Sequence, residues 1–454
     1  MSSPQIEEYL VPGTHVHLVG IGGVSMRPLG LVLSGMGVRI TGSDMSESAS
    51  TADLIAKGIP VHIGHRAENI QGAEALIRTA AVHNDNPEIA AARALGIPIF
   101  ERAQAWGYIM KSYRNAICIS GTHGKTTTTS MVTHIFMEAA KDPTVMIGGY
   151  LPLLGAGHRV GKGDTIIMES CEYCNSFLKF FPTMAVVLDV EADHLDFFKD
   201  LDDVKASFRR FAQLVPPGGC VIANGDDANT NDALRGIPRL TFGFGEESDV
   251  RAVNCSPDWR SFDAVCGGEL WGHFQLNVFG RHNVLNALAA VAVAWKSGIP
   301  ADVTARALEA FRGAGRRLEF KGRFGGADVY DDYAHHPGEL HALIAAVRSM
   351  GYGRIVCAFQ PHTYSRTKAL FDDFVRELKT VDVAVLAEIY AARESNTIGI
   401  SSSDLAAHIP GSIYCETLPD VTACLRRLAR PGDILLTVGA GDIYKAGEAL
   451  LKEE

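Results

Sequence analysis

The chain has 454 residues, which is enough for about three domains of ordinary size. Its 47% hydrophobic and 21% charged residues are typical of a globular protein. A net charge of −10 without any basic run argues against general nucleic-acid binding. No apolar stretch approaches the ~18 residues that span a bilayer, and the first residues lack a signal-peptide pattern, so we expect a cytoplasmic protein that does not act at a membrane.

Nine cysteines are scattered along the chain without a repeated spacing. An odd, unpatterned set in a chain of this length predicts reduced thiols. Cys171 and Cys174 form a single C-x-x-C, which is compatible with redox chemistry or with half of a zinc site. Because no second pair completes such a site, we favour the interpretation that both are small residues in a loop after a strand.

A repeated pattern runs along the chain: a short apolar β run, a glycine-rich or polar turn, and then a helical stretch. Strands that alternate with helices predict an α/β fold with parallel sheets, in which ligands bind beyond the carboxyl ends of the strands. The predicted strands include 16–19, 116–119, 165–168, 185–188, 220–223, 327–330, 355–359, 383–387 and 434–438.

Polar steps at 111–114 and 312–317 divide the chain into three α/β blocks. The predicted domains are residues 1–112, 113–316 and 317–454. One stretch, from about Phe242 to Phe279, is richer in Gly, Trp and Cys and weaker in helical pattern. We expect that stretch to be a locally antiparallel part of the middle domain.

The first block begins with a glycine-rich turn after its first strand. The turn nearly matches the dinucleotide fingerprint G-x-G-x-x-G, but Ser25 stands at the third glycine. An acidic residue follows the next strand, where it would meet a ribose. The pattern indicates a pyrophosphate near a helix N-terminus and leaves open NAD, another nucleotide diphosphate, or a structural turn. The candidate residues are Gly20, Gly22, Gly23, Val24, Ser25, Ser43 and Asp44.

The most informative motif is GTHGKTTTT at 121–129, directly after an apolar run. A strand, a glycine turn, a lysine and hydroxyl residues, followed by a helix that opens at Ser130, are typical of a loop that binds nucleotide phosphates. The loop is shorter than the usual G-x-x-x-x-G-K-[ST], because Ile119 stands where the first glycine belongs. We therefore expect ATP or a close relative to bind here. The candidates are Gly121, Thr122, Gly124, Lys125, Thr126 and Thr127.

Acidic residues and a histidine follow two strands of the middle block. Glu169 follows one strand, and the run Glu191–Asp196, which contains Asp193-His194, follows the next. Carboxylates and an imidazole near a phosphate loop suit Mg²⁺ ions that bridge ATP oxygens. A lone Asp-His pair is usually a surface pair, but its position here favours a metal site.

The segment 280–287 opens a strongly apolar helix. Asn283 and Asn286 can hydrogen-bond an adenine edge, and His282 can stack on the base or cap the helix. Helix capping explains the asparagines equally well, because asparagine is favoured at helix N-termini. Both interpretations stay open from the spacing alone.

In the third block, polar residues follow two neighbouring strands, at 330–337 and at 360–366. The two stretches contain histidines, aspartates and Arg366. Arginine suits a carboxylate and histidine or aspartate suits an amine, so the set is suited to a zwitterion. The tandem His335-His336 would also suit a metal, but no third ligand stands at a sensible spacing.

Together these motifs closely resemble the Mur ligases along the whole chain. Within that family the pattern is most similar to the member that joins L-alanine to UDP-N-acetylmuramate. The resemblance implies three domains: a Rossmann-like N-terminal domain for the UDP-sugar, a P-loop-type central ATPase domain with a mainly parallel sheet, and a Rossmann-like C-terminal domain for the amino acid. It is carried by GTHGKTTTT, ESCEYCNSFL from 169, EADHLD from 191, GRHNVLNALAA from 280, RRLEFKG from 316, DDYAHHP from 331, FQPHTYSRT from 359 and GAGDIY from 439.

The resemblance also implies roles for individual residues. The glycine turn of the first block would hold the UDP diphosphate rather than NAD. Lys125 would serve the ATP phosphates, and Glu172 is a less favoured alternative for the metal carboxylate. The remaining roles are metal binding by Thr126, Glu169 and His194, adenine contacts by His282, Asn283 and Asn286, phosphate contact by Arg317, ribose contact by Asp332, and an L-alanine pocket lined by Tyr333, His335 and Arg366.

The implied reaction is ATP-dependent amide formation through an acyl phosphate, with ATP and two Mg²⁺ ions as cofactors. Lys125, His335 and Arg366 are the candidate catalytic residues, and His335 would receive or orient the proton of the attacking amine. The alternatives are a murein-peptide ligase that joins a tripeptide to the same sugar, an NAD-dependent oxidoreductase, and a non-catalytic nucleotide-gated binding protein. The sequence leaves open whether the protein is a monomer or a homodimer.

Two positions depart from the family pattern. Other members place an arginine where this chain has Thr363, so a second guanidinium for a phosphate or for the alanine carboxylate is missing. Several sister ligases carry a carbamoylated lysine beyond the Asp-His motif. Only Lys205 is nearby here, so we do not expect a carbamate.

Overall fold

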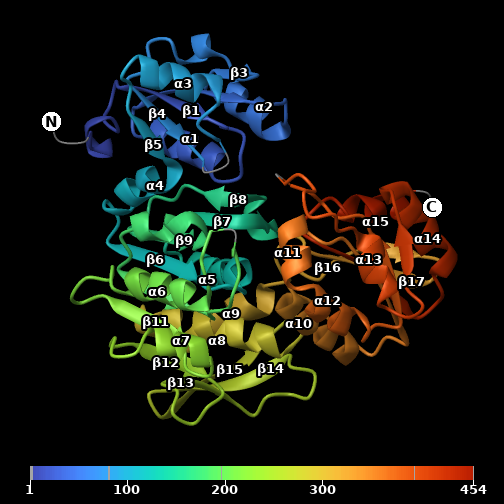
Figure 1. The fold of residues 1–454 in the computed structure, drawn as a ribbon. Coiled ribbons are helices and arrows are strands. Elements are labelled where there is room, and N and C mark those ends of the chain that lie inside the picture. The colour runs from blue at the N-terminus through green and yellow to red at the C-terminus, as the bar shows by residue number, and fades with distance from the viewer. Residues whose placement is uncertain (1–3, 80–81, 196, 393, 453–454) are drawn as a thin grey trace. The chain divides into compact units, whose positions relative to one another are not determined.

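The computed structural model describes residues 4–79, 82–195, 197–392 and 394–452 (Figure 1). The chain forms two compact units, Met1–Phe242 and Gly243–Glu454. Within the described ranges, no helix is both long enough and apolar enough to cross a membrane.

The first unit begins with a five-stranded parallel sheet in the order β3-β2-β1-β4-β5. Strand β1 is buried along its whole length because helices cover both faces of the sheet, and its register places Val19 beside Ser43 of β2. The strands are β1 (His15–Val19), β2 (Arg39–Asp44), β3 (Val61–Ile63), β4 (Ala75–Arg78) and β5 (Ile99–Glu101). The helices are η1 (Ile6–Glu8), α1 (Met26–Gly35), α2 (Ala49–Ala56), η2 (Ala67–Ile70), α3 (Pro87–Ala94) and α4 (Arg102–Met110).

A second sheet of this unit runs in the order β12-β11-β10-β6-β9-β7-β8. All its pairs are parallel except β7 with β8. The strands are β6 (Asn115–Ser120), β7 (Thr144–Leu151), β8 (Ala156–Arg159), β9 (Thr165–Glu169), β10 (Met184–Val187), β11 (Cys220–Asn224) and β12 (Leu240–Gly243). The helices are α5 (Lys125–Glu138), η3 (Pro152–Leu154), η4 (Tyr173–Lys179), α6 (Leu201–Ala212) and α7 (Ala228–Ala233).

Helix α5 begins five residues earlier than the sequence predicted, at Lys125 rather than Ser130. Gly124 precedes it with φ 78°, a left-handed conformation that glycine adopts without strain. The threonines that follow are poor helix formers, but hydroxyls bond back to carbonyls four residues earlier, as Thr129 does to Lys125 at 2.7 Å. The hydroxyl run is therefore part of the helix, and the phosphate loop leads directly into its N-terminus.

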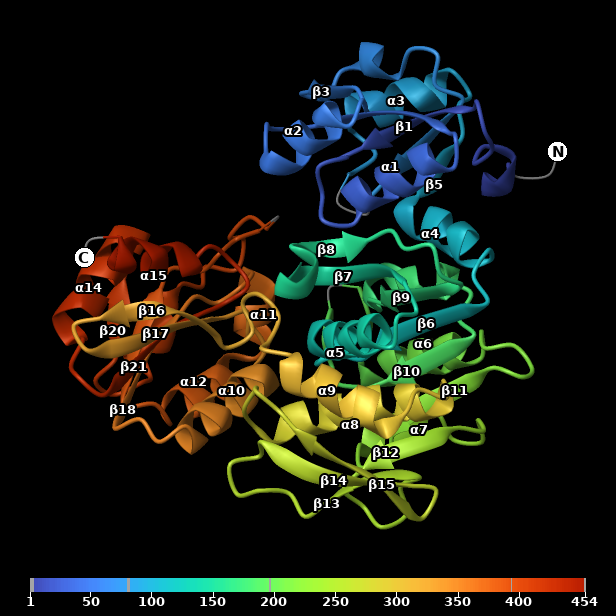
Figure 2. The same cartoon turned by 180° about the vertical axis from the view of Figure 1, so that it is seen from behind.

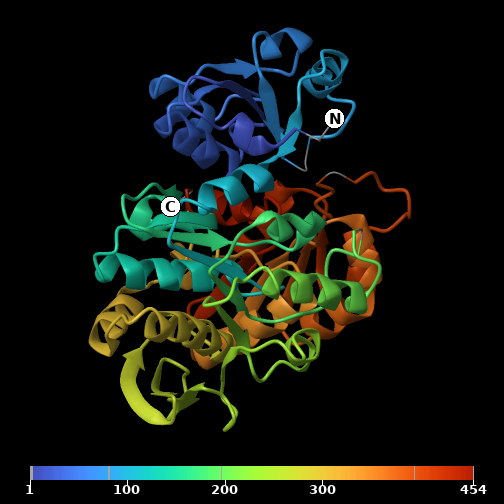
Figure 3. The ribbon, with the colours of Figure 1, turned by 90° about the vertical axis from the view of Figure 1, so that its left-hand side faces the viewer.

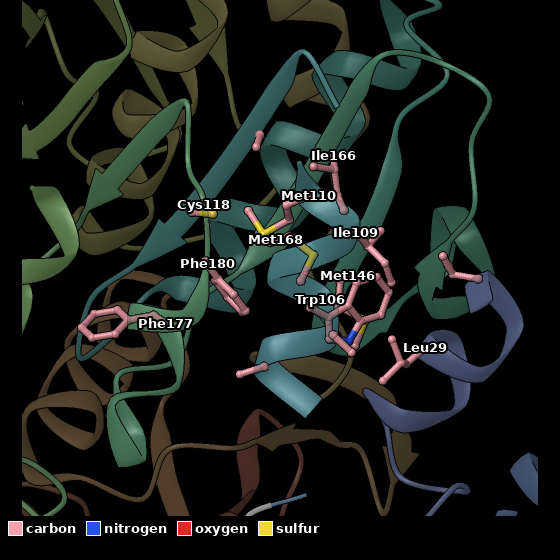
Figure 4. Packing of buried hydrophobic residues seen from close by; sticks show 14 of the residues in the cluster. Leu29, Trp106, Ile109, Met110, Cys118, Met146, Ile166, Met168, Phe177 and Phe180 are labelled. Atoms are coloured by element: carbon pink, nitrogen blue, oxygen red, sulfur yellow. The ribbon is translucent and has the colours of Figure 1, made fainter. Parts of the chain in front are cut away.

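Helix α4 packs its apolar face on the core of the first unit (Figure 4). The Trp106 side chain is 1% exposed, and its indole N–H donates to the carbonyl of Ser25 at 3.3 Å. The same cluster contains Met146, Met168 and Phe177 (Figure 4). This core therefore joins the glycine-rich turn that precedes α1 to the strands that carry the phosphate loop.

The second unit opens with three antiparallel strands, which confirms the antiparallel region predicted between residues 242 and 279. The strands are β13 (Val250–Val253), β14 (Ser261–Cys266) and β15 (Glu269–Gln275). The long helix α8 (Arg281–Lys296) packs on β13 and β14, and α9 (Ala301–Ala310) packs on β15 (Figure 3).

A six-stranded sheet completes the second unit, in the order β16-β17-β21-β18-β19-β20. Among the described strands of this sheet, only β16 and β17 pair antiparallel. Helices α10 and α12 cover one face of the sheet and α14 and α15 the other (Figure 2). The strands are β16 (Glu319–Phe324), β17 (Ala327–Asp332), β18 (Arg354–Phe359), β19 (Val383–Ala387), β20 (Ile413–Cys415) and β21 (Asp433–Val438). The helices are α10 (Pro337–Ser349), α11 (Tyr364–Ala369), α12 (Phe371–Leu378), α13 (Ser402–Ala407), α14 (Leu418–Leu428) and α15 (Tyr444–Leu451).

The predicted α/β class with mainly parallel sheets is confirmed. All nine cysteines are free thiols, as expected from their irregular spacing. The domain boundaries near residues 112 and 316 stay predictions.

Gly107 of α4 provides a test of this packing. A Cβ atom there would lie 2.0 Å from the carbonyl oxygen of Lys179 in η4, a backbone atom that has no free rotation. We expect Gly107→Ala to lower the free energy of unfolding by about 2–3 kcal/mol. Gly35→Ala, in α1 with open space around it, should be neutral or stabilising. Urea unfolding of both variants measures the difference, and equal midpoints would contradict the described packing.

Candidate functional site

The glycine-rich turn lies at the carboxyl end of β1 and is fastened to β2. The N–H groups of Gly20 and Ile21 donate to the carbonyl of Ser43 at 2.8 and 2.9 Å, and the N–H of Gly22 donates to Asp44 Oδ2 at 2.8 Å. A Cβ at Gly22 would lie 2.9 Å from that same carboxylate oxygen, so a side chain there would displace Asp44 from the turn. The structure therefore brings together the turn, Ser43 and Asp44, as the fingerprint predicted.

The last two residues of this turn have the groups that an anion needs. Val24 and Ser25 immediately precede α1. Within the described part of the chain, their backbone N–H groups donate no hydrogen bond. Helix N-termini carry partial positive charge, so these donors suit a diphosphate. The hydroxyl of Ser43 points elsewhere and donates to Glu88 Oε2 at 2.6 Å.

The phosphate loop holds Lys125 at the start of α5. Its Nζ donates to the carbonyls of Gly121 and Thr122 and lies 3.1 Å from Glu172 Oε2. Burial alone would lower the pKa of Lys125, but the Glu172 carboxylate, with that of Glu169, raises it above the usual value. The ammonium group is therefore charged throughout the physiological pH range.

The end of β10 supports the same loop. Asp189 accepts from the N–H of His123 at 2.8 Å and, through its carbonyl, from the N–H of Thr122 at 3.2 Å. Burial raises the pKa of Asp189 to about 6, against the opposing effect of His123. The predicted residues from Gly121 to Thr127 thus form a loop, which Asp189 holds through Thr122 and His123, and the first turn of α5 that follows it.

The predicted metal ligands form two groups rather than one. Thr126 Oγ1 donates to Glu169 Oε1 at 3.0 Å, and the N–H of Gly148 donates to Glu169 Oε2 at 2.7 Å. His194 lies instead beside Glu172, with Nε2 3.7 Å from Oε1. The sequence interpretation ranked Glu172 below Glu169, whereas the structure gives each carboxylate its own partner. Asp196, the last residue of the EADHLD motif, lies outside the described residues.

The donor set at both groups suits Mg²⁺. Carboxylate and hydroxyl oxygens are ordinary ligands of hard divalent ions, the imidazole of His194 is a softer and less usual one, and a thiol is not a ligand of such ions. Cys171 has a potential ligand atom within 4.8 Å of those of Glu172 and His194. Burial raises the pKa of the Cys171 thiol to about 12 when no metal ion is bound. Among the described residues, Cys174 is not part of this group, and the interpretation of the C-x-x-C stays a prediction.

In the second unit, the predicted adenine residues cluster at the start of α8. Gly280, not an asparagine, is the N-cap. Asn283 Nδ2 donates to the carbonyl of Phe279 at 2.7 Å, and Asn286 Nδ2 donates to Asn283 Oδ1 at 3.1 Å. Burial, with the nearby Arg317, lowers the pKa of His282 to about 4, so its imidazole is neutral. Both asparagines therefore hold the turn before the helix, which does not prevent contact with a base.

Asp332 organises the loop that contains Arg317. Its oxygens accept from the N–H groups of Leu318 at 2.6 Å and Ala334 at 2.7 Å, and burial raises its pKa to about 6. The Arg317 guanidinium lies 5.2 Å from the ring centre of Tyr333. The predicted phosphate and ribose contacts thus lie next to the predicted amino-acid residues within one unit.

The proposed amino-acid residues meet through a histidine that the sequence candidates omitted. His362 has its ring 5.9 Å from that of His335, and its Nδ1 lies 3.3 Å from Arg366 Nη1. It stacks on Tyr390 at 5.7 Å, and Tyr333 lies edge-on to His335 at 5.4 Å. His362 was visible inside the FQPHTYSRT motif, but Tyr390 had no signal because it follows a different strand, β19.

Comparison with known families accounts for this arrangement along nearly the whole chain. Residues 15–114 match the catalytic domain of the Mur ligase family, residues 119–294 the Mur ligase middle domain, and residues 316–441 the glutamate ligase domain of Mur ligases. The chain therefore belongs to the Mur ligase family, whose enzymes are ATP-dependent. This membership argues against an NAD-dependent oxidoreductase.

Within the family, the similar relatives share one name. The UDP-N-acetylmuramate–L-alanine ligase of Caldanaerobacter subterraneus subsp. tengcongensis is 43% identical over 447 residues, covering 96% of this chain and 97% of the relative. The enzyme of the same name from Clostridium novyi is also 43% identical, over 96% of this chain and 97% of the relative. The crystal structure of UDP-N-acetylmuramate-alanine ligase MurC from Thermotoga maritima has a TM-score of 0.82 at 28% identity, over 97% of this chain and 98% of that one.

More distant structures share the fold. A murein peptide ligase from Psychrobacter arcticus has a TM-score of 0.72 at 22% identity, over 97% of this chain and 98% of that one. A MurF ligase from Thermotoga maritima, solved in complex with ADP, has a TM-score of 0.63 at 15% identity, over 91% of this chain and 94% of that one.

The pairing of Glu169 with Gly148 generates a test of the metal assignment. A Cβ at Gly148 would lie 2.5 Å from Glu169 Oε1 and would push the carboxylate away from Thr126. We expect Gly148→Ala to raise the Mg²⁺ concentration for half-maximal ATP turnover about tenfold, as Glu169→Gln should. Gly148 is exposed, so the stability of the fold should change little. Gly35→Ala is the matched control, and an unchanged Mg²⁺ dependence in Gly148→Ala would contradict the assignment.

Proposed function

We propose that this protein joins L-alanine to the lactyl carboxylate of UDP-N-acetylmuramate, with ATP converted to ADP and phosphate. The observation that supports this most is the full-length likeness to ligases of that name. The chain also has the phosphate loop, the candidate metal ligands and the candidate amino-acid-binding residues described above. We further propose a cytoplasmic enzyme in peptidoglycan precursor synthesis that acts as a monomer or homodimer without nucleic acid.

The first half of the reaction would activate the carboxylate. A free carboxylate is a poor electrophile, so the γ-phosphoryl group is transferred to it and an acyl phosphate forms. This brings two anions together, and Lys125 places a fixed positive charge where the repulsion arises. The residues Thr126, Glu169, Glu172 and His194 would hold two Mg²⁺ ions, which neutralise triphosphate charge when bound.

The second half would form the amide bond. The amine of L-alanine must be neutral to attack, so a group must accept or orient its proton. His335 is suited to this, because its Nδ1 lies 3.2 Å from Glu339 Oε2, which fixes the ring. Arg366 would hold the alanine carboxylate, and its contact with His362 orients the guanidinium. Attack gives a tetrahedral intermediate that expels phosphate.

Substrate choice separates this proposal from a murein-peptide ligase. We expect phosphate release from ATP and Mg²⁺ in the presence of UDP-N-acetylmuramate and L-alanine, and none when L-Ala-γ-D-Glu-meso-diaminopimelate replaces the alanine. Turnover with the tripeptide but not with L-alanine would show that the protein is a murein-peptide ligase. No turnover with either amine donor would overturn both.

Lys125 is the residue on which the phosphoryl transfer depends. Lys125→Ala should lower kcat at least about a thousandfold, because a charged group that acts mainly in the transition state is removed. Lys205→Ala is the matched control. Lys205 of α6 is also a lysine paired with a carboxylate, that of Asp232 in α7 at 3.1 Å, but it lies outside the phosphate loop. Steady-state ADP release measures both. Substantial alanine-dependent turnover by Lys125→Ala would contradict the proposed role.

A further inference from the structure

A buried polar cluster lies behind the glycine-rich turn of the first unit. We call it the Glu88 cluster, and it consists of Glu88, Ser43, His65, Asn69 and His17. Glu88 lies in the first turn of α3 and is 0% exposed. None of the roles assigned above uses this carboxylate. Burying an ionised carboxylate lowers the stability of the fold unless charged or hydrogen-bonding groups pair with it, so the partners of Glu88 must be identified.

The partners supply the pairing. Ser43 Oγ donates to Glu88 Oε2 at 2.6 Å, and His65 Nδ1 lies 3.1 Å from the same oxygen and from Ser43 Oγ. Asn69 Nδ2 donates to Oε1 at 2.6 Å. Burial would raise the pKa of Glu88, but His17, Ser43 and Asn69 together lower it to about 2. Glu88 is thus a carboxylate at every working pH, and Ser43 and His65 must direct their protons at it.

A chain of hydrogen bonds along β1 and β2 sets the orientation of His17. His15 Nδ1 donates to the carbonyl of Gly72 at 2.8 Å, and burial lowers the pKa of His15, so its Nε2 is an acceptor. Thr41 therefore gives its only hydroxyl proton to His15 Nε2 at 2.9 Å. His17 Nδ1, also 2.9 Å from Thr41 Oγ1, must then be the donor, which leaves its Nε2 facing Glu88 at 3.8 Å.

The cluster is connected to the UDP-sugar turn through β2. Ser43 has its side chain fixed by Glu88, and its carbonyl accepts from the N–H groups of Gly20 and Ile21. The next residue, Asp44, accepts from Gly22 through its side chain and from Gly64 through its carbonyl at 2.8 Å. Gly20 and Ile21 are therefore held by Ser43, which Glu88 bonds directly, and Gly22 is held by Asp44, the residue after Ser43.

From this arrangement we infer that Glu88 is a positioning residue for UDP-sugar binding, acting through Ser43 and His65 on the glycine-rich turn. The inference rests on the proposed function. Glu88 does not touch the nucleotide itself. Its charge holds the donors of the cluster in one orientation, so the free N–H groups before α1 are already placed when the diphosphate arrives.

The test replaces the charge with an amide of the same size. Glu88→Gln should raise the KM for UDP-N-acetylmuramate about tenfold, while kcat and the KM values for ATP and L-alanine change by less than about twofold. Calorimetric titration with UDP-N-acetylmuramate in the absence of ATP should show the same loss of affinity. Asp433→Asn is the matched control, because Asp433 is a buried carboxylate paired with Arg354 in the other unit.

A second variant tests the inference if Glu88→Gln fails to fold. Ser43→Ala leaves Glu88 in place and should give the same selective rise in KM, and in the double variant the two effects should not add. A KM for UDP-N-acetylmuramate that is unchanged in Ser43→Ala, or in a folded Glu88→Gln, would overturn the inference. A parent protein that neither binds nor turns over UDP-N-acetylmuramate would instead refute the proposed function.

Discussion

The buried ammonium group of Lys125 is the constraint around which the phosphate loop is organised. Removing a charge from water costs several kcal/mol, and only closely placed partners offset that cost. Two loop carbonyls and Glu172 supply them, so the ends of β6 and β9 must lie together. The β10 end joins through His194 beside Glu172 and through Asp189 beneath His123. The loop is thus held in shape by the same electrostatics that make it an anion site.

The first unit buries two charged side chains of opposite sign, Lys125 and Glu88, and pairs each of them with polar groups. At the phosphate loop a cation is buried among acceptors, whereas at the Glu88 cluster an anion is buried among donors. In both cases the buried charge is bonded to the loop or to the strand beside it: Lys125 donates to the carbonyls of Gly121 and Thr122, and Glu88 accepts from Ser43, the residue on which the glycine-rich turn is held. Parallel sheets favour this arrangement, because all the connecting loops at one edge leave in the same direction.

Motif spacing predicted much of the fold and several of the residues that lie together at the candidate site. Apolar runs marked the strands because buried parallel strands are apolar on both faces. What spacing could not predict was which of two nearby carboxylates faces which partner. Glu169 is the last residue of β9, whereas Glu172 directly precedes η4. The chain leaves the strand between them, so the two side chains meet different partners, and neither Ser170 nor Cys171 is a glycine that would have marked this change.

Long-range pairing hid the other residues that the sequence missed. Tyr390 reaches His362 because a bridge joins the two backbones, with Tyr390 N–H donating to the carbonyl of Pro361 at 2.9 Å. Nothing in the local sequence around Tyr390 reports that partner. Glu88 was overlooked for another reason: an acidic residue in the first turn of a helix is expected for the helix dipole alone. Only its burial and its donors show a further use.

Thr363 shows how a departure from the family pattern can be accommodated. Its φ of 67° is uncommon for a β-branched residue, costs about 1–3 kcal/mol and persists only where the surroundings enforce it. They do, because its N–H donates to Tyr390 O at 2.9 Å and its carbonyl accepts from the Thr367 hydroxyl at 2.7 Å. Its own hydroxyl caps α11 by accepting from the Arg366 N–H. Position 363 therefore contributes through its backbone, which turns the chain from β18 into α11 and sets Arg366 beside His362 without a second guanidinium.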